Sequence, residues 1–322
     1  MPALQVRSLV IAGEIIVIIA LVAMYLSCTH PILVHPLARN AVSSSSSRYK
    51  YFYEPTQNLE DIGTHEFDSG RAAYRTSVAG FRGGSNYDIP KPADTFRIIT
   101  LGDSFTFGVY LDSDETFPFL LEQKLNRVGF CGAAGYKHIE VVNFGVPGYD
   151  IPYAAERLRL HENDYQPDLI VWFIKHDDFG STETSRAVLQ AMGEGRFNSA
   201  TADPALVAEF DRHMAEATSP EASKAAALDA LHNVAAQYGK SLLVYAPQDF
   251  TLDILPVLTA AQEEYDFQLF TPPKHIFKGD RVHFDSHPTL QGTQTIADHL
   301  FRYLIEQNPT ACPSALPATK KK

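Results

Sequence analysis

The stretch of sequence that decides the fold covers residues 97–108 and reads RIITLGDSFTFG. Its first half is a continuous apolar run, which is typical of a strand buried on both faces. The run stops at Gly102-Asp103-Ser104, and an amphipathic pattern follows. The pattern therefore places Ser104 at the carboxyl end of a strand and at the start of a helix. Open α/β sheets bind ligands at this edge, where backbone N–H groups can stabilise an anion.

Outward from this strand, apolar runs alternate with amphipathic stretches. We expect strands over 96–101, 139–144, 169–174 and 241–246, and helices over 116–127, 151–163, 220–238, 255–264 and 290–306. This alternation predicts a parallel sheet with helices on both faces. Residues 180–220 indicate a helical insertion, which either lies over the site or forms a solvent-facing helical pair.

The N-terminal region differs in composition from the rest of the chain. Residues 8–27 are mostly apolar and long enough to cross a bilayer, so residues 1–28 are predicted to be a membrane anchor or signal segment. A cleaved signal peptide is the competing interpretation, because Arg7 precedes the run. Five consecutive serines at 43–47 favour a tether and lead-in over 29–70. We expect the globular part to begin between residues 49 and 74, and the tail over 309–322 to be disordered.

Composition limits the classes of function. With 322 residues and 45% hydrophobic side chains, the chain can bury one large core. A net charge of −11 without a basic stripe excludes nucleic acid as an expected partner. Cys131 and Cys312 can pair if the domain is exported, or remain two free thiols. The histidines and cysteines lack metal-ligand spacing, so we expect no metal or cofactor.

Three later segments extend the pattern that Gly-Asp-Ser begins. They are VVNFGVPG at 141–148, PDLIVWF at 167–173 followed by KHDD at 175–178, and DSHP at 285–288 with a glycine at 292. Together the four segments resemble, in order, the SGNH/GDSL hydrolase family over residues 70–305. The resemblance implies a flavodoxin-like three-layer α/β/α sandwich with a mainly parallel sheet, and a catalytic domain over 71–308.

Residues 74–83 also look like the approach segment of the membrane-tethered bacterial members. This resemblance implies that the catalytic domain is periplasmic or extracellular, anchored by the N-terminal helix. The protein would be secreted if the N-terminal segment is cleaved.

The resemblance also implies a catalytic triad. Ser104 would be the nucleophile, which needs a base to take its proton. His287 would be that base, and Asp285 would hold the imidazole in the right tautomer. The spacing Asp-x-His departs from the more usual Asp-x-x-His, which occurs here as Asp280 to His283 but without the proline and glycine expected after it. A turn that only caps the last helix is the structural alternative for Asp285 and His287.

An oxyanion hole would complete the site. The resemblance implies as donors the backbone N–H groups of Ser104 and Gly145 and a side chain at position 177. Position 177 is an aspartate where the family has an asparagine, and an ionised carboxylate only accepts hydrogen bonds. Three features would compensate for the missing amide. Asp177 would be protonated beside Asp103 or Asp178, or His176 would donate in its place, or Lys175 would supply positive charge.

These features predict a serine esterase that forms an acyl-enzyme on Ser104. The substrate would be a small-molecule ester or an O-acyl group of a glycan. Acyl transfer to a glycan hydroxyl uses the same intermediate and stays open, as does a non-catalytic binding protein, because of Asp177. A phosphate loop at 102–108 is excluded by the absence of its lysine and glycine spacing. Aromatic residues near the strand ends, which border the cleft or belong to the core, are Tyr149, Trp172, Phe173 and Phe179.

Overall fold

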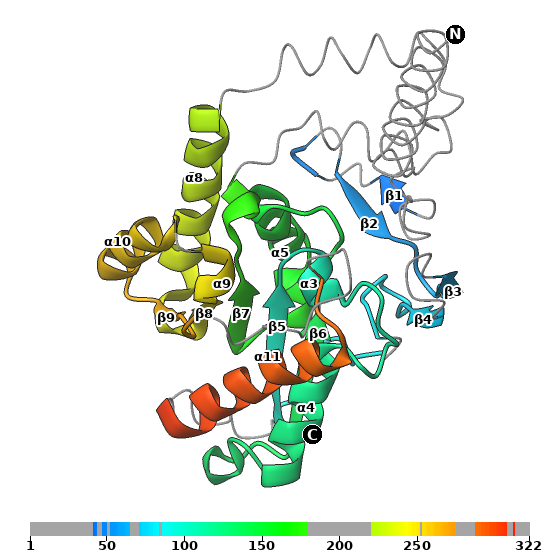
Figure 1. Ribbon diagram of the computed structural model, residues 1–322. Helices are drawn as coiled ribbons and strands as arrows, with labels where there is room; N and C mark the ends of the chain where they lie inside the picture. Colours follow the sequence, from blue (N-terminus) through cyan, green and yellow to red (C-terminus); the bar gives the residue numbers. More distant parts are fainter. Residues whose placement is uncertain are drawn as a thin grey trace, which may run out of the picture.

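The computed structural model describes residues 41–43, 47–49, 52–64, 71–83, 86–179, 220–251, 253–274, 287–307 and 312 (Figure 1). Within these ranges no helix has both the length and the hydropathy to cross a membrane. The predicted anchor at 8–27, most of the predicted insertion, and both Asp285 and His283 lie outside the described residues.

Five parallel strands form the central sheet. They are β5 (Thr95–Leu101), β6 (His138–Asn143), β7 (Leu169–Phe173), β8 (Leu242–Tyr245) and β9 (Gln268–Phe270). Their order across the sheet is β6-β5-β7-β8-β9. This is the flavodoxin-like order, in which the direction of winding reverses at the first strand. The ends of β5 and β7 therefore form the crevice in which such sheets bind ligands.

Helices cover both faces of the sheet (Figure 1). One face packs against α4 (Phe117–Val128) and α11 (Leu290–Arg302). The other packs against α5 (Ile151–Tyr165), α8 (Pro220–Tyr238) and α10 (Leu255–Tyr265). Successive side chains of each strand point to opposite faces, so every strand contributes to both layers of the core. The predicted three-layer sandwich is confirmed.

The predicted elements agree with the observed ones to within about two residues, the usual uncertainty of element ends. The last helix differs, because α11 ends at Arg302 and continues as a π-helical segment over Tyr303–Gln307. Strand β9 was missed. Its three residues are only half-buried at the sheet edge, so the strand lacks the long apolar run of the central strands.

The described segments before residue 71 belong to the fold. Strand β1 (Ala41–Ser43) pairs with β2 (Tyr53–Pro55), and β3 (Glu60–Thr64) pairs with β4 (Arg71–Arg75), both antiparallel. Phe52 is 1% exposed and belongs to the α5-side core, and Tyr49 stacks on Tyr153 with ring centroids 4.8 Å apart. The start of the packed core at Tyr49 and Phe52 falls within the predicted range of 49–74 and ahead of residue 71, because aromatic residues in this polar lead-in bury large apolar areas.

A disulfide joins Cys131 to Cys312, with the two Cα atoms 5.5 Å apart. The sequence left open whether these two cysteines pair or remain free thiols, and the structure shows that they pair. The bond attaches residue 312, within the tail predicted to be disordered, to the loop that follows α4.

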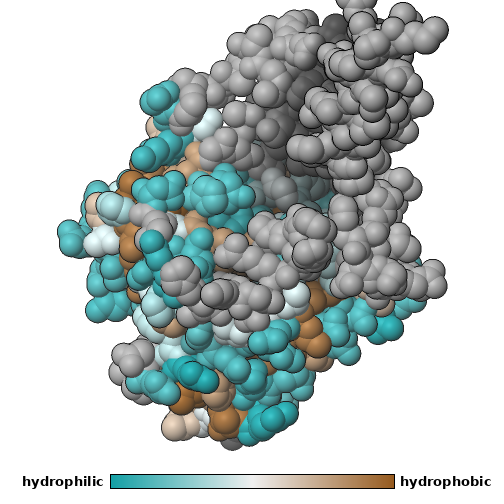
Figure 2. Space-filling view, viewed as in Figure 1, coloured by the Kyte–Doolittle hydropathy of each residue, from teal (hydrophilic) through white to brown (hydrophobic). Residues whose placement is uncertain are grey.

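Figure 2 shows hydrophilic residues over much of the described surface on one face, with apolar residues between them. The exposed large apolar side chains within the described ranges are Val78, Ile89, Val128, Leu290 and Ile305. They come from separate segments of the chain.

Candidate active site

Ser104 is the first residue of the short helix α3 (Ser104–Phe107), directly after β5. The turn depends on Gly102, whose φ of +145° is one that other residues rarely adopt. A Cβ atom at this position would lie 2.3 Å from Oγ1 of Thr106. Asp103 caps the helix, because its Oδ1 accepts a hydrogen bond from the N–H of Phe105 at 2.9 Å. The serine is therefore held at the carboxyl end of the strand, as predicted.

His287 lies opposite Ser104, although 183 residues separate them in the sequence. The imidazole Nε2 is 2.8 Å from the serine Oγ. The rings of Phe105 and Tyr110 border the imidazole, with centroids 5.2 Å and 5.4 Å away. The 2.8 Å between Nε2 of His287 and Oγ of Ser104 is short enough for proton transfer. Helix α11 is capped by Thr289, whose side chain accepts from the N–H of Gly292, so His287 is not the N-cap of this helix.

The loop after β6 packs tightly against α3. A Cβ atom on Gly145 would lie 2.3 Å from the backbone nitrogen of Phe107, which explains why glycine is needed there. The N–H of Gly145 donates to Oδ1 of Asn143 at 2.9 Å, and the amide of Asn143 donates to the carbonyl of Thr106 at 2.8 Å. The oxyanion role predicted for Gly145 therefore requires its N–H to be shared with Asn143 or released from it.

Two residues of the segment 141–148 received no role from the sequence. Asn143 bridges the loop and α3, and the asparagine at the end of the strand-like run was the signal for it. Gly148 is exposed with a φ of +79°, and its N–H has no hydrogen-bond partner among the residues that the structure describes. The sequence feature that indicates Gly148 is its place in the Val-Pro-Gly turn.

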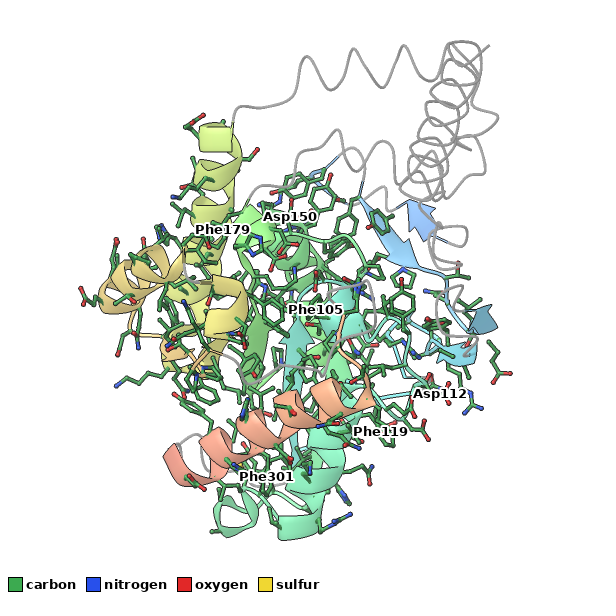
Figure 3. The ribbon with its side chains drawn as sticks, in the orientation of Figure 1. Phe105, Asp112, Phe119, Asp150, Phe179 and Phe301 are labelled. Carbon is green, nitrogen blue, oxygen red and sulfur yellow. A yellow bond between two sulfur atoms is a disulfide. The ribbon has the colours of Figure 1, made fainter. Side chains whose placement is uncertain are left out.

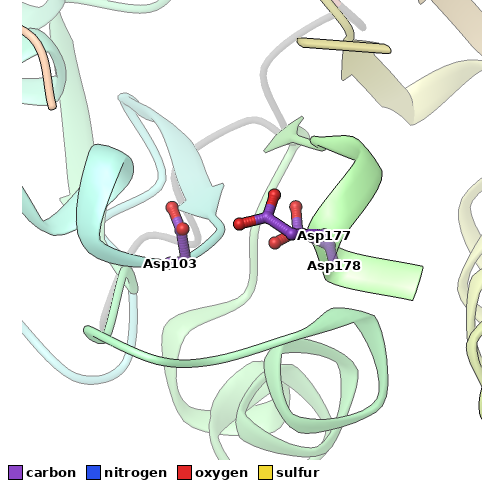
Figure 4. Close-up of side chains that lie close together, drawn as sticks. All are labelled: Asp103, Asp177 and Asp178. Carbon is purple, nitrogen blue, oxygen red and sulfur yellow. The ribbon is translucent and has the colours of Figure 1, made fainter. Parts of the chain in front are cut away.

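A buried lysine occupies the end of β7. Lys175 is 4% exposed, and its Nζ lies 2.8 Å from Oδ2 of Asp103, 2.7 Å from Oδ1 of Asp177 and 3.3 Å from Oδ1 of Asp178. Asp177 and Asp178 belong to the 3-10 helix η2 (His176–Phe179). Figure 4 shows their carboxylates facing that of Asp103 across the gap between the two strand ends. Carboxylate oxygens of the three residues lie within 4.8 Å of one another, as metal ligands would, but here they surround the Lys175 ammonium.

The pKa values of the two neighbouring aspartates shift in opposite directions. Burial raises the pKa of Asp178 well above its usual range, although the Lys175 ammonium opposes this shift. Partial burial also acts to raise the pKa of Asp177, but the Lys175 ammonium outweighs it and the pKa is lowered. The Asp177 side chain is 62% exposed. The hypothesis that Asp177 is protonated is therefore wrong, and Asp178 is the carboxyl whose neutral form burial favours.

The other two compensating features have different outcomes. Nδ1 of His176 lies 3.0 Å from the carbonyl of Phe250 in the short helix α9 (Gln248–Thr251), so that nitrogen is bonded outside the serine site. Lys175 does bring positive charge to the site, next to Asp103, the residue that precedes Ser104. Burial acts to lower the pKa of Lys175, but its carboxylate partners outweigh burial and raise it, so the ammonium stays charged.

The four aromatic residues noted near the strand ends all belong to the core. Tyr149, Trp172, Phe173 and Phe179 are each buried. Phe105 was not singled out, yet its ring borders both His287 and the ammonium of Lys175, whose Nζ is 5.1 Å from the ring centroid. Figure 3 shows Phe105, a residue of α3, in the middle of the molecule.

A family model described as GDSL-like Lipase/Acylhydrolase matches residues 98–300, which is more than half of the chain. The chain belongs to this family, and it is an ester-hydrolysing enzyme. The matched range contains both Ser104 and His287. No curated protein sequence gives a significant match.

Several solved structures are distantly similar. The esterase EstA from Pseudoalteromonas sp. is 16% identical over 66% of this chain and 97% of its own, with a TM-score of 0.40. A family 3 carbohydrate esterase from Clostridium thermocellum is 15% identical over 68% and 99%, also with a TM-score of 0.40. A two-domain esterase active on acetylated mannans is 12% identical over 70% of this chain, with a TM-score of 0.42. This chain covers 53% of that protein's length.

Proposed function

We propose that this enzyme is a serine esterase that forms an acyl-enzyme on Ser104. The observation that carries the proposal is the 2.8 Å distance between Ser104 Oγ and His287 Nε2 at the end of β5. A serine hydroxyl becomes an effective nucleophile when an adjacent base takes its proton. Asp285 is proposed to orient the imidazole and to stabilise its positive charge.

The reaction follows from this pair. His287 Nε2 takes the hydroxyl proton while Ser104 Oγ attacks the ester carbonyl carbon. The imidazolium then returns the proton to the departing alcohol oxygen, which leaves the acyl group on Ser104. Water attacks this acyl-enzyme with His287 again as the base, and the acid is released. Each proton that His287 takes is returned, so the enzyme ends in its starting state.

The oxyanion would be stabilised by backbone donors. The N–H of Ser104 is one, and the loop after β6 offers Gly145, or Gly148 while the N–H of Gly145 remains bonded to Asn143. Asp177 carries a carboxylate in place of an amide and, when ionised, cannot donate, so position 177 is expected to supply no hydrogen-bond donor. Because one donor contributes about 10² to 10³ in turnover, we expect a lower kcat than for a site with three donors.

The substrate is inferred to be a small-molecule ester or an O-acyl group of a glycan. The sequence resemblance supports this substrate class. Transfer of the acyl group to a glycan hydroxyl would use the same acyl-enzyme, with the sugar replacing water in the second step. Release of free acid in the presence of an acceptor glycan distinguishes the two reactions, because a transferase would move the acyl group to the glycan instead.

We further propose that the catalytic domain works outside the cytoplasm. The Cys131–Cys312 disulfide supports this location, because disulfides persist in oxidising compartments. The apolar segment at 8–27 would be the anchor, or the signal segment of a secreted form.

The test is hydrolysis of p-nitrophenyl acetate by the full chain in detergent, together with labelling by a fluorophosphonate probe. Ser104→Ala and His287→Ala should each lower hydrolysis by at least about 10³, and Ser104→Ala should abolish labelling. His283→Ala is the matched control and should keep most of the activity. Loss in His283→Ala with retention in His287→Ala would overturn the proposed base. A folded parent protein that neither labels nor hydrolyses would favour the binding-protein alternative.

A further inference from the structure

Lys175 is a buried cationic side chain that contacts Asp103, the residue before Ser104, and the reaction proposed above does not use it. Lysine is almost never fully buried unless it is paired. Here it is 4% exposed and links the ends of β5 and β7 through Asp103 and the two aspartates of η2. Strand β7 ends at Phe173, and only Ile174 lies between the strand and Lys175, so the strand fixes where the lysine lies.

Asp103 connects this lysine to the nucleophile. Its Oδ1 accepts from the N–H of Phe105, and its Oδ2 lies 2.8 Å from the Lys175 Nζ and 3.3 Å from Oγ of Ser104. The serine oxygen is also 2.8 Å from Nε2 of His287. A hydroxyl has one proton, so it donates to only one of these two acceptors at a time. Only the bond to His287 leads to proton transfer and attack.

The charge on Asp103 therefore matters for the reaction. A carboxylate without a counterion would compete with His287 for the serine proton, because an ionised acceptor binds a hydroxyl more strongly than a neutral one. It would also stand beside the oxygen on which negative charge develops, and like charges repel more strongly in a site that excludes water. The Lys175 ammonium neutralises the same Oδ2 that faces the serine.

We propose that Lys175 is a positioning residue of the esterase: by holding the Oδ2 of Asp103, it directs the proton of Ser104 to His287 and removes a negative charge from beside the oxyanion. This inference rests on the proposed role of Ser104.

Asp103 is the nearer of the two buried carboxylates around the ammonium, at 2.8 Å against 3.3 Å for Asp178. Asp177 is 62% exposed, so water screens its charge. Burial favours the neutral form of Asp178. The Asp103 side chain is 11% exposed, and the ring of Phe105 lies over the ammonium and also borders His287. The Lys175–Asp103 pair is buried and adjoins the part-buried Ser104–His287 pair, so the charge on Asp103 is screened less than it would be in bulk water.

The experiment compares four proteins by kcat and KM on p-nitrophenyl acetate: the parent, Lys175→Met, Asp103→Asn, and the double variant Lys175→Met/Asp103→Asn. Methionine keeps the length of the lysine without its charge, and asparagine can still cap α3. We expect kcat of Lys175→Met to fall about ten- to a hundredfold with KM within about threefold, a smaller loss than that of a direct oxyanion donor. We expect the double variant to recover to within about fivefold of the parent.

Recovery of kcat in the double variant would distinguish this role from a purely structural one. If the Lys175–Asp103 ion pair only held the ends of β5 and β7 together, the double variant would be at least as slow as Lys175→Met, because both partners of the pair are gone. That outcome, or a kcat of Lys175→Met within twofold of the parent, would overturn the proposal. Failure of the proposed function itself would show in the parent, as absence of Ser104-dependent labelling.

Lys175→Met leaves three carboxylates together and can fail to fold. In that case the comparison is between Lys175→Met/Asp178→Asn, which keeps the charge on Asp103, and the triple variant that adds Asp103→Asn. The proposal then expects the triple variant to have at least about tenfold higher kcat, the lower end of the loss expected for Lys175→Met. Equal kcat in these two proteins would overturn it.

Discussion

At the scale of single residues, Asp177 is the position where the sequence and the family pattern disagree. The structure makes it the exposed partner of a buried lysine rather than a hydrogen-bond donor. Its lowered pKa means that it is charged throughout the neutral range. The ion pair also stabilises the folded state. Its contribution to the free energy of unfolding is present above the ordinary pKa of the carboxyl and is lost as the pH falls through the lowered pKa.

We therefore predict that the pH profile of hydrolysis does not depend on Asp177 between about pH 6 and 9, well above a lowered carboxyl pKa. Asp177→Asn removes a negative charge and adds an amide donor, so its hydrolysis rate should equal that of the parent or exceed it by up to about tenfold. The measurement is the initial rate on p-nitrophenyl acetate across this range. A parent rate that falls with rising pH through a carboxyl titration, and a flat rate in Asp177→Asn, would contradict the ionised assignment.

At the scale of elements, the serine site depends on how closely the loop after β6 approaches α3. Asn143 ties the two together through its own side chain, and Gly145 leaves no room for a Cβ atom between them. Ser104 is thus positioned by packing between two segments that are about forty residues apart in the sequence. Such a close approach of backbone to backbone usually requires glycine.

Gly145→Ala should separate this loop from α3. We expect a loss of about 2–4 kcal/mol in the free energy of unfolding, because the clash is with backbone atoms that cannot rotate away. We also expect a lower kcat, since Ser104 lies in α3. Gly132→Ala is the control: a Cβ atom there meets nothing within 4 Å, so stability should change by less than about 0.5 kcal/mol. Urea unfolding of the three proteins measures the difference, and equal stability would contradict the tight packing.

A glutamate couples α4 to the edge strand β6. Oε2 of Glu122 accepts from the N–H of Val141 at 2.8 Å. Burial raises the pKa of Glu122 to about 7, and the charge of Glu140 adds to this. Because the folded state then binds more protons than the unfolded state, the contribution of Glu122 to stability is fully present below the ordinary carboxyl pKa and is lost as the pH rises through about 7.

Glu122→Gln should remove this pH dependence while keeping an oxygen acceptor for Val141. Relative to this variant, the parent should lose up to about 3 kcal/mol of unfolding free energy between pH 5 and 8. Urea unfolding at both pH values measures the loss. Glu263→Gln, at an exposed position on α10, is the matched control and should follow the parent. If the parent and Glu122→Gln respond equally to pH, Glu122 is ionised in the folded state.

At the scale of the whole molecule, the disulfide closes a long part of the chain. Cys131 and Cys312 are 181 residues apart, and the loop between them contains β6 to β9 together with α5, α8, α10 and α11. A covalent link across such a loop restricts the unfolded chain strongly, which stabilises the folded state by comparison.

Replacing both cysteines by serine should therefore lower the free energy of unfolding by about 2–5 kcal/mol. Thermal unfolding with and without dithiothreitol is the measurement: the reductant should lower the Tm of the parent to that of the variant. The double variant itself should not respond to the reductant. A parent Tm that the reductant leaves unchanged would show that the bond contributes little.

Much of this molecule could be predicted from local patterns. The strands β5 to β8 are largely apolar, and caps such as Asp150 before α5 mark where helices begin. Because alternation of such elements permits few topologies, the parallel three-layer fold follows from them. Gly102 to Ser104 mark the nucleophile for the same reason, since a turn at a strand end is a local property.

The remaining features depend on contacts between distant segments. A local repeat in the sequence does not predict which carboxylates pair with Lys175 or that Asn143 accepts from the N–H of Gly145. It also does not predict that Phe52 is buried in the core. The protonation of neighbouring aspartates also depends on which one the fold buries, so Asp177 and Asp178 differ although they are adjacent.

The sequence by itself determined the order of the elements, the parallel sheet and the position of Ser104 at its edge, because hydrophobic periodicity and turn residues act within a few positions along the chain. Only the tertiary structure decided that His287 lies at hydrogen-bond distance from that serine, that the two cysteines pair, and that a lysine neutralises Asp103. The physical reason is that hydrogen bonds, disulfides and charge pairs act over a few ångströms in space, and packing of the helices on the sheet determines which distant residues come that close.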